Sequence, residues 1–179
     1  MTKETHSKGG YIAGLWLLPY VYDTFFIHYN LTYRIVLLFI YTYFTYLGSL
    51  ISDIDMKGSY ISKRFTLLYK LFGKRFKHRG FTHSLLFIGF VAFVGDLVIV
   101  SSNNNIVFTC IFSGILAGVI SHIALDLLTK EGVELFYPVG INFSLLPIKT
   151  SSKTEKKFNK FLSLLVVFLI GYRFYLFRF

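Results

Sequence analysis

The chain has 179 residues, of which 54% are hydrophobic and 16% are charged, and its formal net charge is +10. A water-soluble domain of this length rarely carries so much apolar side chain, so lipid is the expected solvent for part of the molecule. The positive charge is concentrated in two loops between apolar runs, which follows the positive-inside rule and argues against nucleic-acid binding. Cys110 is the single cysteine, so no intramolecular disulfide can form.

Five apolar runs predict one bundle of about five transmembrane helices, an all-α fold. About 20 residues cross the hydrocarbon core, and a helix satisfies its own backbone hydrogen bonds there. The first run has the outline of a signal peptide, but Pro19, Asp23 and the lack of a small-residue cleavage site predict a short, kinked helix that the mature protein keeps. The expected helices cover residues 11–27, 31–51, 81–100, 106–128 and 161–177.

The segment 60–77, between the second and third runs, predicts an amphipathic helix with lysines on one face. Its apolar side chains recur at the three- or four-residue spacing of the other face: Ile61, Phe65, Leu68, Phe72 and Phe76. We expect this helix to lie flat on the membrane, attracted to anionic headgroups by about 1 kcal/mol per basic residue. The alternative is a solvated basic face on a helix that packs against the bundle.

The basic residues also predict how the chain is oriented. The positive-inside rule places the loops 52–80 and 129–160 in the cytoplasm together with the amino terminus, and it places the turn at 103–105 and the carboxy terminus outside. The glycines and prolines of 129–149 predict a folded loop rather than a span. We expect one multi-pass domain, 1–179, in an inner (cytoplasmic) membrane, with anionic membrane lipids as partners.

This topology brings ionisable side chains from four segments to one depth of the membrane, near the cytoplasmic face. Such residues cost several kcal/mol in a spanning helix unless they are paired or coordinated, so each one is a functional candidate. His6 is expected to precede the first helix, and the others lie near the ends of the next three. The candidates are His6, Asp53, Asp55, His78, His83, His122 and Asp126.

The spacing and type of these residues suggest a metal site. His122 and Asp126 lie four apart on a predicted helix, so they share a face and can hold one cation. Asp53 and Asp55 would point the same way in an extended segment but apart on a helix. Imidazole and carboxylate without cysteine suit zinc, manganese or iron. Each member also has a simpler explanation. His122 and Asp126 could be a buried hydrogen-bonded pair, and His83 could cap a helix. Asp53 and Asp55 could form a helix-ending turn, and His6 could be solvated.

Three sequence blocks resemble a known family. Residues 48–55 read GSLISDID, residues 78–84 read HRGFTHS and residues 118–129 read GVISHIALDLLT. In this order, and with Thr5-His6 before them and Gly132 after them, they are similar to the YdjM-type family of membrane-bound, predicted metal-dependent hydrolases. The resemblance covers residues 5–147. Ser52 stands where that family usually has proline, which alters the turn but removes no ligand.

The family pattern is in turn distantly similar to zinc-dependent phospholipases C and single-strand nucleases, which cleave phosphoesters. This resemblance implies a first metal position and a second that His6 and Asp53 complete. Because no later His-x-x-x-Glu pair follows, a full three-metal cluster is not expected. The implied ligands of the first position are Asp55, His83, His122 and Asp126.

A divalent cation at this site, zinc or manganese, would lower the pKa of a bound water to about 7. His78 is the candidate proton shuttle, while Arg79 could bind phosphate oxygens or snorkel to headgroups. No Gly-x-Ser-x-Gly elbow or phosphate-binding Gly-rich loop is present, which argues against serine-hydrolase or nucleotide chemistry.

The sequence therefore predicts a membrane-bound metal-dependent hydrolase that cleaves a phosphoester of a lipid or lipid-linked substrate at the cytoplasmic face. One alternative is a metal-ion carrier, although only Asp23 and Asp96 lie near the outer side, whereas an ion path needs polar residues through the membrane depth. The other alternative is a catalytically silent membrane regulator that keeps the metal for structure.

Overall fold

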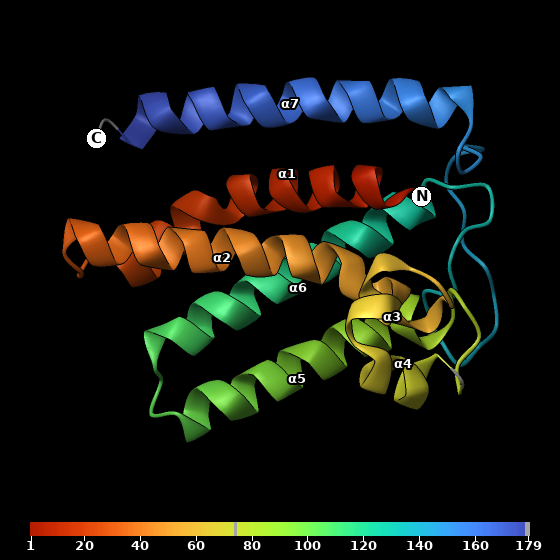
Figure 1. Cartoon of the computed structure of the whole chain (residues 1–179), viewed down its shortest axis with the longest axis horizontal. Coiled ribbons are helices and arrows are strands. Elements are labelled where there is room, and N and C mark those ends of the chain that lie inside the picture. The colour runs from red at the N-terminus through yellow and green to blue at the C-terminus, as the bar shows by residue number, and fades with distance from the viewer. Residues whose placement is uncertain (74, 178–179) are drawn as a thin grey trace.

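A computed structural model describes residues 1–73 and 75–177, which form helices, turns and isolated bridges without a named strand. The predicted all-α fold is confirmed. The long helices run alongside one another, and they share one end where α1, α5 and α7 begin and α2 and α6 finish (Figure 1). These helices are α1 (Lys3–Val21), α2 (Leu31–Ile51), α5 (Leu85–Ser101), α6 (Ile106–Leu127) and α7 (Lys153–Phe177).

Three of the described helices are long and apolar enough to cross a membrane: Leu31–Asp55, Ile106–Leu127 and Lys153–Leu176. The shorter α5 is apolar but has only 17 residues. Charged residues in the first turns of α1 lower its hydropathy, so α1 does not qualify by composition. The structure thus supports three of the five predicted spans by length and composition, and the spans at α1 and α5 stay predictions.

The bounds of α2 and α6 match the prediction to within a residue, but α1 and α7 begin earlier than expected. The first helix starts at Lys3 instead of residue 11, and it continues beyond Pro19 into a π-helical turn, Tyr22–Phe26. The carboxylate of Glu155 accepts hydrogen bonds from the Thr2 backbone and the Thr5 hydroxyl, and so ties the first turns of α7 and α1 together. His6 therefore lies within α1, which corrects the expectation that it precedes the first helix.

The helices α2 and α6 approach each other closely because glycines line their contact. A Cβ atom built on Gly118 would lie 2.4 Å from the backbone nitrogen of Ser49, and one on Gly48 would lie 2.3 Å from the carbonyl oxygen of Ile115. Small residues of this kind let backbones meet without a gap, as in membrane helix pairs. Since α1 packs on both helices, these three form the centre of the bundle, with α5 against α6 and α7 against α1.

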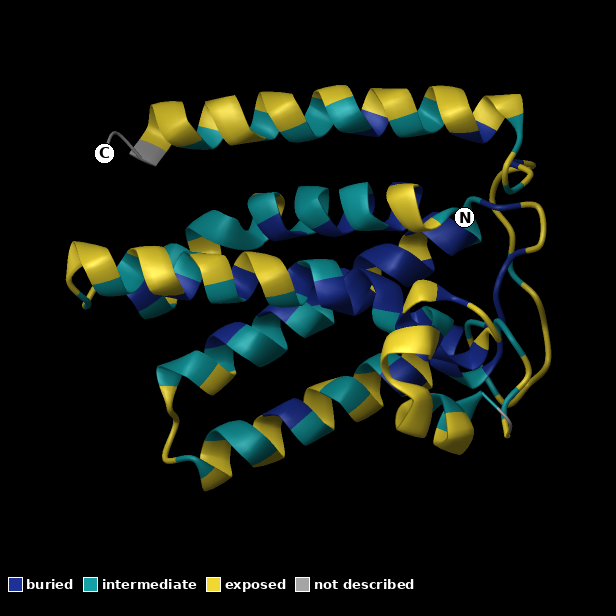
Figure 2. Ribbon diagram, viewed as in Figure 1, coloured by how far each residue is buried: buried dark blue, intermediate teal, exposed yellow. Residues whose placement is uncertain are grey.

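Buried side chains gather at the end of the bundle where α1 begins, while α7 is mostly exposed (Figure 2). The predicted helix 60–77 is broken there into α3 (Tyr60–Arg64) and α4 (Thr66–Phe72), and turns follow. The break falls at Phe65, whose φ of −117° and ψ of 65° are not helical. One continuous interfacial helix is therefore not observed, and Lys74 of its predicted basic face lies outside the described residues.

The predicted folded loop after α6 is confirmed. Isolated bridges join Thr129 to Ile148 and Val133 to Phe143, and Gly132 turns the chain with a positive φ of 63°. The carbonyl oxygen of Leu135 accepts a hydrogen bond from the first residue of α5, so the loop closes over the shared end of the helices.

Candidate metal centre

The candidate residues gather at the shared end of the bundle, as the sequence predicted. His6 comes from the first turns of α1, and His122 and Asp126 come from the last turns of α6. Asp53 and Asp55 lie on a 3₁₀ turn, Ser52–Asp55, directly after α2, and His83 ends a second 3₁₀ turn, Phe81–His83, before α5. Close packing of α1, α2 and α6 therefore sets the distances between these side chains.

Two imidazole nitrogens face each other at the centre of the site. The Nε2 atoms of His83 and His122 are 3.2 Å apart, and both side chains are fully buried. The Nδ1–H of His122 donates to the Ser49 carbonyl at 2.7 Å. The Thr82 hydroxyl donates to Asp55 and lies 3.0 Å from His83 Nδ1, whose N–H it can accept. The outer nitrogen of each ring can thus carry a proton, and Nε2 of each ring points inward, where it can bind a cation once it is deprotonated.

Two carboxylates complete this arrangement. An oxygen of Asp126 lies 3.5 Å from His83 Nε2 and 3.7 Å from His122 Nε2, and an oxygen of Asp53 lies 3.9 and 3.7 Å from the same two atoms. Metal–ligand bonds of about 2.0–2.2 Å in a tetrahedral site put donor atoms roughly 3.3–3.6 Å apart. His83, His122 and Asp126 therefore have donor spacings close to those of a tetrahedral site, and Asp53 lies slightly farther from the two imidazoles.

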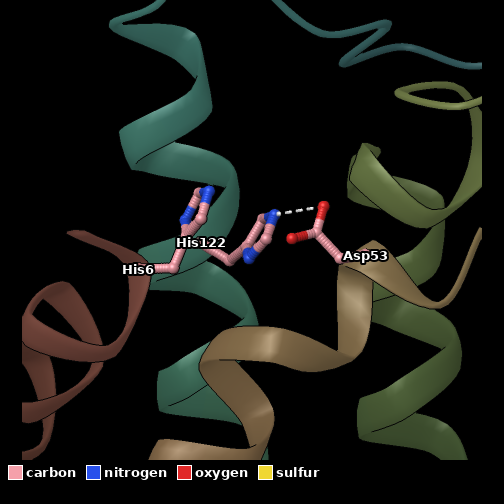
Figure 3. A group of neighbouring side chains, drawn as sticks. All are labelled: His6, Asp53 and His122. Atoms are coloured by element: carbon pink, nitrogen blue, oxygen red, sulfur yellow. Dashed lines mark ion pairs between the residues drawn. The ribbon is translucent and has the colours of Figure 1, made fainter. Parts of the chain in front are cut away.

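His6 extends the site toward α1. Its ring stacks on that of His122 with centroids 3.7 Å apart, and Figure 3 shows the His122 ring between His6 and Asp53. Neither nitrogen of His6 has a hydrogen-bond partner, although Nε2 lies 3.3 Å from Asp126. A buried imidazole nitrogen without a hydrogen-bond partner is costly in protein interiors, and Nδ1 of His6 also has no ion-pair partner. A bound cation would supply the missing partner, so this residue also fits a metal site.

The donors form three overlapping groups in which all ligand atoms lie within 4.8 Å of one another. Asp53, His83 and His122 each belong to two of the groups, so the groups describe one elongated site rather than three separate ones. His6 belongs to one end of that site and His78 to the other. The groups are His6–Asp53–His122, Asp53–His78–His83 and His83–His122–Asp126.

Asp55 is outside these groups, in contrast to the direct ligand that the resemblance implied. The turn after α2 is helical rather than extended, so Asp53 and Asp55 flank His83 from opposite sides. Asp55 lies 3.5 Å from the outer nitrogen of His83 and pairs with His78 at 2.8 Å. Carboxylates in this position commonly fix the orientation of metal-binding histidines. Asp55 therefore positions His83 and His78 in this structure.

The charge of the site depends on His83. Burial alone would lower the pKa of His83, but hydrogen bonds and charge from Asp126 and Asp55 outweigh burial and raise that pKa to about 9. A proton on Nε2 then separates the two facing nitrogens when no cation is bound. A cation would take the place of this proton, because metal ligands must be deprotonated.

Arg79 points to protein groups rather than into open space. Its Nη1 donates to Thr129 at 2.8 Å and to the Gly132 carbonyl at 3.2 Å, and Nη2 lies 3.5 Å from Asp126. The side chain is only 14% exposed, so it does not snorkel to headgroups. Its φ of 67° also directs the backbone N–H to Asp55. Arg79 therefore holds Asp126 and the loop in this structure, and its contact with phosphate oxygens stays a prediction.

Sequence reasoning missed several supporting groups. Thr82 bridges Asp55 and His83 from the same 3₁₀ turn, and its buried hydroxyl could have been noticed because it precedes a candidate ligand. Ser49 and Thr129 lie in the blocks that resemble the family, but their roles could not be assigned there, since a backbone acceptor and a loop contact appear only in the fold.

We expect the purified protein to retain a divalent metal after extensive dialysis, with zinc or manganese as the candidates. The double variant His83→Ala, His122→Ala should lose metal by at least about tenfold, because even groups that only hold ligands affect metal affinity by roughly 10–100-fold. His28→Ala, at an exposed position at the other end of the bundle, is the matched control and should keep the metal. Elemental analysis measures all three; equal metal in the double variant and the unchanged protein would remove the proposed site.

Comparison with known proteins identifies the family of the chain. A family model described as YdjM inner membrane protein matches residues 1–179. The uncharacterized protein YvsG of Bacillus subtilis is 37% identical over 110 residues, 61% of this chain and 64% of that protein. Inner membrane protein YdjM of Escherichia coli is 34% identical over 107 residues, 60% of this chain and 53% of that protein. The matched stretch thus spans about half to two thirds of these relatives, and no solved structure gives a significant match. Because the family model covers its whole length, the chain belongs to the YdjM family of inner membrane proteins.

Proposed function

We propose that the chain is a membrane-embedded metal-dependent hydrolase that cleaves a phosphoester of a lipid or lipid-linked molecule at the membrane surface. The observation that carries this proposal is the pair of inward-facing imidazole nitrogens, 3.2 Å apart, with carboxylates beside them. This donor set has nitrogen and oxygen atoms alone, as in catalytic rather than thiolate-bound structural sites. Asp126 also lies beside the amino group of Met1 at 2.5 Å, which shows how strongly charged this buried end is.

Different residues around the site can bind the cation and transfer the proton. A bound divalent cation supplies a Lewis acid and a water whose pKa is lowered to about 7. His83, His122, Asp53 and Asp126 would hold that cation. His78 is 37% exposed at the mouth of the site, and its Nδ1 is engaged by Asp55. Its Nε2 is therefore the atom that takes up or delivers a proton, as general acid–base catalysis requires.

The core at the opposite end of the bundle supports a hydrolase over a metal-ion carrier. Among the described residues it consists of a buried cluster without an ionised side chain: Val21, Phe26, Leu37, Tyr41 and Cys110. Asp23 and Asp96, which could have continued an ion path, are both exposed. A carrier would need polar groups through this depth.

We further propose that α1 and α5 cross the membrane beside the three candidate spans and that the site end faces the cytoplasm. The helix α1 lies alongside α2 and α6, and α5 lies alongside α6 (Figure 1). The helix α4 exposes Leu67, Leu68 and Leu71 at the site end, next to the basic residues of the loop, which suits contact with anionic lipid.

Reporter fusions test this topology. Alkaline phosphatase needs disulfides that form outside the cytoplasm, so a fusion after Lys77 should be inactive and one after Asn104 should be active. An active fusion after Lys77 would reverse the orientation and move the site to the external face.

The hydrolase proposal predicts that metal-loaded protein releases phosphate or phosphorylated headgroups from detergent-solubilised phospholipids or lipid-linked phosphates. His78→Gln should lower turnover by about 10²–10⁴-fold, because it removes proton transfer. Metal content should be kept, because His78 is not one of the four residues proposed to hold the cation. His28→Gln is the matched control and should retain full turnover. Equal background release by the unchanged protein and by His122→Ala, from every substrate, would contradict the proposal and favour the silent regulator.

A further inference from the structure

A wholly apolar cavity of about 370 Å³ lies between α2, α4, α5 and α6, and every side chain that lines it is aliphatic or phenyl. It exists because α5 packs mainly against α6, so a space remains between α5 and α2. The helices α3 and α4 cover the site end of this space. We call this cavity the alkyl groove.

The alkyl groove has a buried floor and an exposed rim. Its floor includes Leu47 and Ile61, which are 7% and 2% exposed, whereas the rim residues Phe65, Leu68 and Phe90 are 38–45% exposed. With α5 in the membrane, as proposed above, an apolar hollow on its side faces lipid tails. Its volume falls in the range of small-ligand sites, about 300–1,000 Å³. The groove is therefore too small to hold another helix, which is about 10 Å wide.

The groove lies beside the metal centre. Ile54 lines it and stands between Asp53 and Asp55 in the chain, and Phe87 lines it one helical turn after His83. At its far end, Phe112 lies ten residues before His122 on α6, about 15 Å away along the helix. The groove therefore runs from the neighbourhood of the candidate ligands toward the middle of the bundle, and apolar side chains such as Ile54 and Phe87 lie between it and those ligands.

We infer that the alkyl groove holds one hydrocarbon chain of the substrate while its phosphate headgroup lies at the metal centre. The inference rests on the proposed function and adds that the hydrocarbon chain of the substrate is recognised, and where it binds. A tail that leaves the bilayer for the groove exchanges one apolar environment for another, so little hydrophobic affinity is gained. The groove therefore selects substrates by chain length and shape and positions the headgroup.

Photo-crosslinking tests this occupancy without requiring turnover. The probe is an anionic glycerophospholipid with a diazirine at the end of one acyl chain, added to the full-length protein in detergent micelles. In the unchanged protein, crosslinks should map to groove residues near Phe112 and Val94. Ile115→Trp should reduce them several-fold by filling the far end of the groove. Leu15→Trp, in the separate apolar crevice between α1 and α7, is the matched control and should leave them unchanged.

Chain-length selectivity gives a second readout that misfolding cannot mimic. Ile115→Trp should lower kcat/KM for a long-chain lipid by about tenfold relative to a short-chain analogue, and Phe112→Ala should shift the preference toward longer chains. Crosslinks that are unchanged in Ile115→Trp, or that spread evenly over the outer helix faces, would overturn the inference. Groove crosslinks without hydrolysis of any lipid would instead overturn the proposed function alone.

Discussion

Two lone pairs cannot face each other at 3.2 Å in a buried site unless a proton or a cation lies between them, and His83 and His122 are held in that arrangement. The close contact of α2 with α6 through Gly48 and Gly118 brings the Ser49 carbonyl within 2.7 Å of His122. Because the backbone of one helix orients the ligand of another, any looser packing would release the imidazole. The rest of the site follows from this contact.

The supporting groups act on the same two rings from outside. Asp55 and Thr82 hold the outer nitrogen of His83, and Arg79 links Asp55, Asp126 and the loop after α6. Arg79 does so with a left-handed backbone conformation that costs on the order of 1–3 kcal/mol in a residue other than glycine. A strained residue that joins two carboxylates suggests that their separation matters more than local stability.

Sequence patterns predicted the parts of the molecule that depend on local composition. The apolar runs located α2 and α6. The histidines and aspartates near one end of the predicted helices include most of the residues that the structure brings together. Burial of His6 and the outer position of Asp55 were not predictable, since the first depends on α1 packing against α6 and the second on a 3₁₀ turn. The break at Phe65 was missed because helical periodicity continues across it.

X-ray absorption at the K edge of the bound metal tests the central claim most directly, because it reports the donor atoms themselves. The account predicts nitrogen and oxygen ligands at about 2.0–2.2 Å, with imidazole scattering that weakens in His122→Ala. A sulfur ligand at about 2.3 Å, or a metal whose spectrum shows no imidazole, would contradict it.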